Sequence, residues 1–169
     1  TVLAFFIGSA YLEEGDFKKA RTFLQKKDCK EYQKKRRSPL LAQLFYEMGD
    51  YDLAAEEFLN FYREIFNDFS GDSQSILSKL APNELILFAL IQKARGMNWK
   101  EIMDLASCNQ EYTDMNWNDY RSLLQEEFED LEPADSGIYG PSLNFNRRRR
   151  KYYQERIHLV QEFQKEMRS

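Results

Sequence analysis

Apolar side chains recur at intervals of three and four along most of this chain, which is the spacing of amphipathic helices. In the segment 2–14 one stripe is formed by Leu3, Phe6, Ile7, Ala10 and Tyr11. Val2, Phe5 and Leu12 lie off that stripe, so the segment is apolar nearly all round. A helix of this kind is normally covered on more than one side.

The same spacing predicts seven further helices. They are expected at 17–27, 39–48, 52–66, 84–95, 99–107, 117–131 and 146–167. The basic segment 26–37 is expected to extend the helix 17–27. No strand-length alternation of apolar and polar residues remains between them. The chain is therefore predicted to be all-α.

One pattern occurs twice at an offset of 34 residues. Gly15-Asp16-Phe17-Lys18-Lys19-Ala20 recurs as Gly49-Asp50-Tyr51-Asp52-Leu53-Ala54. In each copy glycine permits the turn after one helix, and aspartate caps the next. A repeat of this length indicates stacked helical hairpins.

The small residues Gly8/Ala42 and Ala20/Ala54 occupy equal places in the two 34-residue units, where paired helices must approach closely. Together with the G-D-[FY]-x-x-A turn, this pattern over residues 1–68 resembles the tetratricopeptide repeat (TPR) family. The segment 83–108 resembles it more weakly, through Gly96, Trp99, Ile102 and Ala106. The resemblance implies a right-handed superhelix of helical hairpins that acts as a non-enzymatic scaffold or adaptor.

The resemblance also implies a concave groove lined by the first helix of each hairpin. Its positions carry Val2, Phe5, Ser9, Leu12, Glu13, Arg36, Pro39, Gln43, Tyr46 and Glu47. Chaperone-tail binders of the family use Lys and Asn at several of these places, so that ligand is disfavoured here. An apolar peptide, a partner helix or the chain's own last helix suits the groove better. Alternatively, preceding repeats of a longer protein cover Val2 and Phe5.

Composition shifts predict three regions. Residues 1–131 form the TPR-like domain, with an inserted loop near 67–82. Residues 132–143 contain prolines and glycines and form a linker, and 144–169 form a basic C-terminal helix. Because a helical pattern begins at once without an initiator Met, we expect a fragment of a larger subunit in a multiprotein assembly.

The charges are segregated. Residues 18–37 have a net charge of +8, residues 101–135 of −10 and residues 144–169 of +5. The densest cationic run is Arg147, Arg148, Arg149, Arg150 and Lys151, followed by two tyrosines. With Arg36 and Arg37 of the segment 26–37, it is the basis of an alternative function in nucleic-acid binding, in which the rings stack on bases. Docking of the run, on the acidic stretch or on a partner, is favoured over both nucleic-acid binding and a solvated face.

The composition offers little for catalysis. His158 is the single histidine, and neither Cys29 nor Cys108 has a CxxC partner, so we expect no metal site, no cofactor and no enzymatic activity. No apolar run approaches the roughly 20 residues that a membrane-spanning helix needs. We expect an intracellular protein, cytoplasmic or nuclear, with a protein partner. A homodimer through the apolar first helix is left open.

Overall fold

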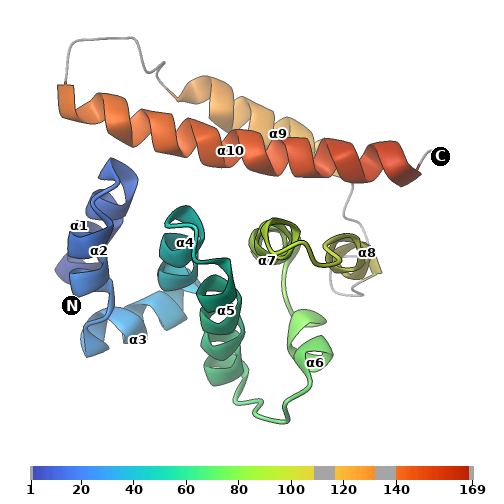
Figure 1. Ribbon diagram of the computed structural model, residues 1–169, viewed down its shortest axis with the longest axis horizontal. Coiled ribbons are helices and arrows are strands. Elements are labelled where there is room, and N and C mark those ends of the chain that lie inside the picture. Colours follow the sequence, from blue (N-terminus) through green and yellow to red (C-terminus); the bar gives the residue numbers. More distant parts are fainter. Residues whose placement is uncertain (1, 109–116, 132–139, 168–169) are drawn as a thin grey trace. The chain divides into compact units, whose positions relative to one another are not determined.

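The computed structural model of the protein describes residues 2–108, 117–131 and 140–167. These ranges fold into helices joined by turns, and no strand occurs among them, which confirms the predicted all-α class for this part of the chain (Figure 1). The chain divides into two compact units, Thr1–Ile76 and Leu77–Ser169. The sequence had placed the first boundary at 132 instead.

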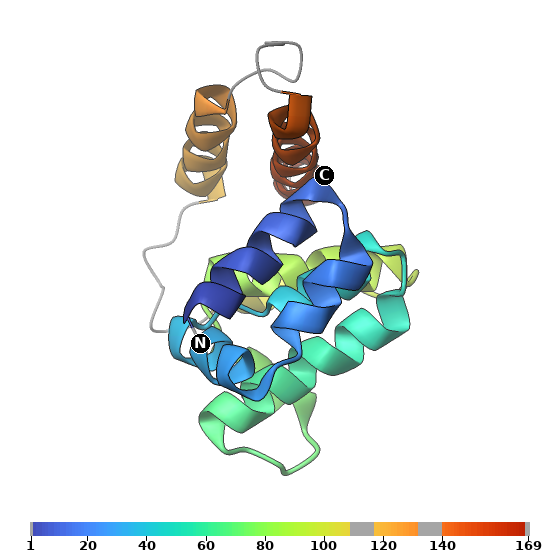
Figure 2. The ribbon, with the colours of Figure 1, turned by 90° about the vertical axis from the view of Figure 1, so that its left-hand side faces the viewer.

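Unit 1 consists of five helices: α1 (Val2–Glu14), α2 (Phe17–Leu24), α3 (Lys27–Arg36), α4 (Leu40–Glu47) and α5 (Tyr51–Phe66). Two hairpins are formed, because α1 packs on α2 and α4 packs on α5. In Figure 2 the two helices of the first hairpin, drawn in blue, lie side by side in front. Helix α2 also contacts α4, and α3 packs against both α1 and α2.

The two Gly-Asp turns have the same geometry. Gly15 and Gly49 adopt φ values of +85° and +84°, a left-handed conformation that a side chain disfavours. Asp16 Oδ1 accepts a hydrogen bond from the Lys19 backbone N–H at 3.2 Å, and Asp50 accepts one from Leu53 at 3.4 Å. Each aspartate thus caps the second helix of its hairpin, as the repeated motif predicts.

A helix begins at Phe17 as predicted, but the predicted extension to residue 37 is wrong, because the chain turns at Lys26 and begins a separate helix, α3. Leu24 and Cys29 are both fully buried. On one continuous helix, residues five apart would point about 140° away from each other, so the break lets both reach the core. Buried Gln33 fixes the corner by donating from its amide to the Leu24 carbonyl at 2.9 Å.

Unit 2 contains α7 (Pro82–Ala94), α8 (Lys100–Cys108), α9 (Trp117–Asp130) and α10 (Gly140–Met167). The short helix α6 (Ser73–Leu77) spans the boundary between the units and lies within the predicted inserted loop. Helix α7 packs on α8, α9 packs on α10, and α10 also contacts α7. Helix α10 begins inside the predicted linker 132–143, since proline is tolerated in a first helical turn. The rest of that linker, 132–139, lies outside the described residues.

The last helix is held in unit 2 by an aromatic cluster. The buried Phe163 ring makes edge contacts with Trp99 at 6.5 Å and with Trp117 at 5.9 Å between ring centroids. The Trp117 indole N–H also donates to Ser107 Oγ at 2.7 Å, which ties the start of α9 to α8. One phenylalanine therefore joins α10 to the first residue of α9 and to the residue that precedes α8.

Two ion pairs flank this cluster. Glu162 pairs with Lys93, and Glu166 pairs with Lys100. Both lysine ammonium groups also lie over the Trp99 ring, at 5.4 and 5.7 Å from its centroid. Because the pairs are substantially exposed, each contributes little to stability by itself, and the apolar contact carries the docking.

We expect Phe163→Ala to destabilise unit 2 by about 3–5 kcal/mol, because it removes a buried ring from between two indoles. Both tryptophans of the chain, Trp99 and Trp117, lie in this unit, so tryptophan fluorescence in a urea titration reports its unfolding. The control Leu123→Ala removes a side chain that is 50% exposed on α9 and should leave the midpoint nearly unchanged. Equal shifts for the two variants would contradict this role of Phe163.

Candidate functional site

The predicted groove face of α1 is covered by the chain itself. Phe5 is 7% exposed and Leu12 is 2% exposed. The Tyr32 ring of α3 meets the Phe5 ring edge to face, with 4.9 Å between centroids. In this conformation neither Phe5 nor Leu12 is available to a partner, because the separate helix α3 packs against α1 where the groove was expected.

The opposite face of α1 is exposed. Leu3 is 70% exposed and Phe6 is 53% exposed, although both belong to the apolar stripe that the periodicity indicated. The core side is set by Gly8, where an added Cβ would lie only 2.8 Å from a Leu24 methyl carbon. Since α1 is apolar nearly all round, its sequence could not decide which face lies inward.

The remaining predicted groove residues differ in exposure and in the contacts that they make. Val2 is 42% exposed, and Glu13 is partly buried. Ser9 turns its hydroxyl back to donate to the Phe5 carbonyl at 2.8 Å. On α4, Gln43 donates to Glu47 at 3.4 Å, and the Tyr46 ring lies 5.8 Å from that of Tyr51. Arg36 belongs to the end of α3, and Pro39 precedes the first residue of α4.

Arg36 and Arg37 lie against aromatic rings at the end of α3. The Arg36 guanidinium lies over Tyr32 at 5.8 Å from the ring centroid and donates to its hydroxyl at 3.5 Å. Arg37 adopts the left-handed conformation that ends the helix, with φ of 50°, and lies over Phe66 at 5.1 Å. Both cations therefore contribute to the packing of unit 1.

The cationic run at the start of α10 is partly engaged within unit 2. Arg150 donates to the Phe128 and Leu131 carbonyls at 3.5 and 3.2 Å, and its guanidinium lies 4.2 Å from the Phe128 ring centroid. It thereby satisfies carbonyl groups at the C-terminal end of the acidic helix α9. Lys151 remains exposed, with Glu155 at 4.0 Å.

The other members of the run differ in exposure. Arg148 is partly buried and Arg149 is exposed, whereas the side chain of Arg147 lies outside the described residues. The neighbouring rings of Tyr152 and Tyr153, expected to stack on bases, instead lie against Arg156 at 4.3 and 4.4 Å. Both rings therefore already have a cationic partner within the helix.

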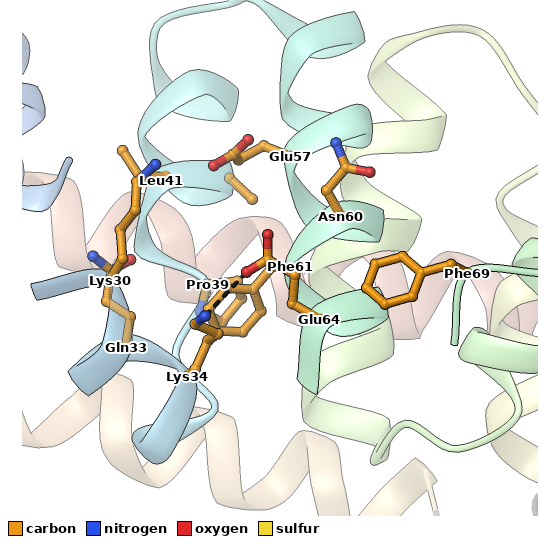
Figure 3. A pocket seen from close by; sticks show the side chains of 11 residues that line it. Lys30, Gln33, Lys34, Pro39, Leu41, Glu57, Asn60, Phe61, Glu64 and Phe69 are labelled. Atoms are coloured by element: carbon orange, nitrogen blue, oxygen red, sulfur yellow. Dashed lines mark ion pairs between the residues drawn. The ribbon is translucent and has the colours of Figure 1, made fainter. Parts of the chain in front are cut away.

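A cavity of about 220 Å³ opens between α3, α4 and α5, and no sequence pattern had indicated it (Figure 3). Charged side chains from α3 and α5 face each other across it. Lys34 pairs with Glu31 at 2.9 Å and with Glu64 at 3.1 Å, and these hydrogen bonds raise the pKa of the Lys34 ammonium. Phe61 and Phe69 add aromatic surface, and Phe69 is 67% exposed.

Glu57 stands apart from these pairs. Figure 3 draws the Lys34–Glu64 ion pair, and within the described part of the chain no hydrogen bond or ion pair reaches the Glu57 carboxylate. Burial raises the pKa of the Glu57 carboxyl, the nearby Lys30 lowers it, and the charge of Glu64 raises it further. The cavity thus contains a partly desolvated carboxylate without a direct partner.

Comparison of the chain with models of protein families finds no match, and comparisons with curated proteins and with solved structures find none either. In the ranges that the structure describes, no cluster of three potential His, Cys, Asp or Glu ligands is present. None of the helices described combines the length and the apolar character needed to cross a bilayer.

The adjacent residues Phe5 and Phe6 test which face of α1 lies inward. Phe5→Ala should lower the stability of unit 1 by about 3–5 kcal/mol, because it removes a buried ring, whereas Phe6→Ala should cost less than about 1 kcal/mol. Amide hydrogen exchange of α1–α3, measured for both variants, reports the difference. A greater loss for Phe6→Ala would show that the faces are assigned the wrong way round.

Glu57→Gln should stabilise unit 1 at neutral pH. The carboxyl pKa is raised on folding, so in the wild type stability falls as the pH rises from below 4.5, the ordinary value, through the raised pKa of Glu57. Since this carboxyl is only partly buried, we expect a gain of less than about 1 kcal/mol, and none at acidic pH.

The matched control for this pH dependence is Glu56→Gln, which alters an exposed neighbour on the same helix. Amide exchange of α5 measured across the pH range compares the two variants. If Glu57→Gln destabilises unit 1 at neutral pH, the carboxylate has a stabilising partner and its assignment is wrong.

Proposed function

We propose that this chain is a non-enzymatic protein-interaction module, an adaptor or scaffold built from TPR-like hairpins. The observation that carries the proposal is the exposed apolar face of α1. Val2, Leu3 and Phe6 expose 42%, 70% and 53% of their surfaces, and the exposed Ala10 continues the face along the helix. Large apolar side chains grouped in this way mark interaction sites more often than scattered ones do.

The TPR-like part of the proposal is supported by unit 1. Its two hairpins share turn geometry at Gly15 and Gly49, and they place Gly8 in close contact with Leu24 as the small-residue pattern requires. The unit differs from the TPR pattern in the extra helix α3 between the hairpins. Because α3 packs against α1, we place the partner on the exposed face of α1 rather than in a concave groove.

The charges of unit 1 define the chemistry of the partner. Helices α2 and α3 pack against α1 and carry an excess of exposed cations, among them Lys18, Lys19 and Lys27. An amphipathic segment with an apolar stripe and acidic flanks fits this combination. Its apolar side chains supply affinity on Leu3 and Phe6, while its acids set orientation and encounter rate.

The test compares the full chain with the Leu3→Ser/Phe6→Ser double variant. Captured proteins are identified by quantitative mass spectrometry, and the acidic segment of the best candidate is then titrated against both chains. We expect at least about a tenfold loss of affinity in the double variant, while stability is retained because both residues are exposed. The control Met48→Ser alters another exposed apolar residue of unit 1.

Unchanged affinity of the double variant would refute this placement of the partner. Concentration-dependent self-association abolished by the double variant would make a second copy the partner, and thus overturn the acidic-segment assignment. Salt-sensitive retention of RNA or DNA, lost when the cations of segments 26–37 and 147–151 are replaced, would instead support the nucleic-acid alternative.

A further inference from the structure

The cavity between α3, α4 and α5 has the size of a site for one side chain. Its volume of about 220 Å³ lies below the roughly 300–1,000 Å³ of pockets that hold drug-sized ligands. The apolar residues Leu41 and Ala42 of α4 form part of its lining. It therefore suits a short chain with a functional end group better than a whole peptide or a large cofactor.

The charged side chains that line the cavity are not all paired. Lys34 is shared between the carboxylates of Glu31 and Glu64, so its ammonium group is already paired twice. Lys30 and Glu57 remain, and no ion pair joins them. Two carboxylates and two ammonium groups thus line the cavity, and Glu57 is the carboxylate among them without an ion pair.

A positive charge in the cavity would be stabilised most beside the Glu57 carboxylate. A partly buried carboxylate without a hydrogen-bond donor has lost part of its hydration, and no direct hydrogen bond replaces it. Among the groups around it, Glu64 and Glu56 act to raise its pKa in the same direction as burial, whereas Lys30 and Arg21 oppose them. A cation placed against Glu57 would relieve both the desolvation and the repulsion between carboxylates.

Aromatic rings complete the site. Phe61 lies on the same helix as Glu57, and Phe69 follows the end of that helix with two thirds of its surface exposed. In Figure 3 the Phe61 ring lies beside Lys34 and Glu64, and the Phe69 ring stands apart to the right of them. The faces of aromatic rings attract ammonium and guanidinium groups.

We propose that this cavity binds the cationic end of a lysine or arginine side chain from another protein, with Glu57 as the counter-ion and Phe61 and Phe69 as its walls. Arginine is the better ligand of the two, because its planar guanidinium can donate two parallel hydrogen bonds to one carboxylate. This site shares no side chain with the exposed face of α1. A test of the cavity therefore does not decide the function proposed above, and the reverse also holds.

The experiment titrates the full chain with N-acetyl-arginine amide and follows the backbone resonances of α3–α5 by NMR. N-acetyl-citrulline amide, which has nearly the same shape without the charge, is the matched neutral probe. We expect saturable shifts around the cavity with the arginine probe. The affinity for the citrulline probe should be lower by about tenfold or more.

Three variants locate the binding. Glu57→Gln should weaken binding of the arginine probe about tenfold, and Glu56→Gln, which alters an exposed neighbour on the same helix, should weaken it much less. Lys30→Gln should strengthen binding, because it removes the ammonium group that competes for Glu57. The inference is overturned if Glu57→Gln binds like the wild type, if both probes bind equally, if Lys30→Gln weakens binding, or if no saturable shift is seen.

Discussion

The edge-to-face contact between Phe5 and Tyr32 determines which surface unit 1 presents. Tyr32 reaches Phe5 only because the chain breaks at Lys26 and returns as a separate helix, α3, that packs against α1. Once Phe5 is inward, Gly8 and Leu12 follow at helical spacing, and Leu3 and Phe6 must point to the other side. One aromatic contact thus separates the covered face of α1 from the face that is free to bind.

The corner that positions α3 is built from buried groups of mixed chemistry. Leu24 and Cys29 fill the apolar interior, and the Gln33 amide satisfies a carbonyl that the end of α2 leaves open. A buried amide of this kind specifies one geometry, because any other path of the chain would leave it unpaired. The same rigid placement of α3 sets Lys30 and Lys34 opposite α5 and so creates the cavity.

Much of the fold could be predicted because its signals are local. The Gly-Asp motifs contain both the left-handed turn residue and the helix cap, and the two hairpins form where these motifs occur. The binding surface could not be predicted in this way. The segment 2–14 is apolar on all sides, so only tertiary contacts with α3 decide which side is covered. Glu57 carried no signal at all, since a single glutamate on a predicted helix is normally solvated.

The basic run at the start of α10 is a second case in which the composition suggests one role and the contacts of the side chains indicate another. Its composition suits phosphate binding, yet Arg150 satisfies carbonyl groups of α9, and Tyr152 and Tyr153 lie against Arg156. Of the three explanations that the sequence left open, docking on the acidic helix is the one with contacts in unit 2. The exposed Arg149 and Lys151 remain at its edge.

The central claim is that α3 covers the Phe5 face of α1 and leaves the Phe6 face to solvent. Nuclear Overhauser contacts between the aromatic protons of these rings measure it directly in solution. Strong contacts between Phe5 and Tyr32, together with none from Tyr32 to Leu3, are the expected result. The contradicting result has two parts: Phe6 and Leu3 contact the interior, and a soluble paramagnetic agent reaches the Phe5 ring. The chain would then present a different face of α1 for binding.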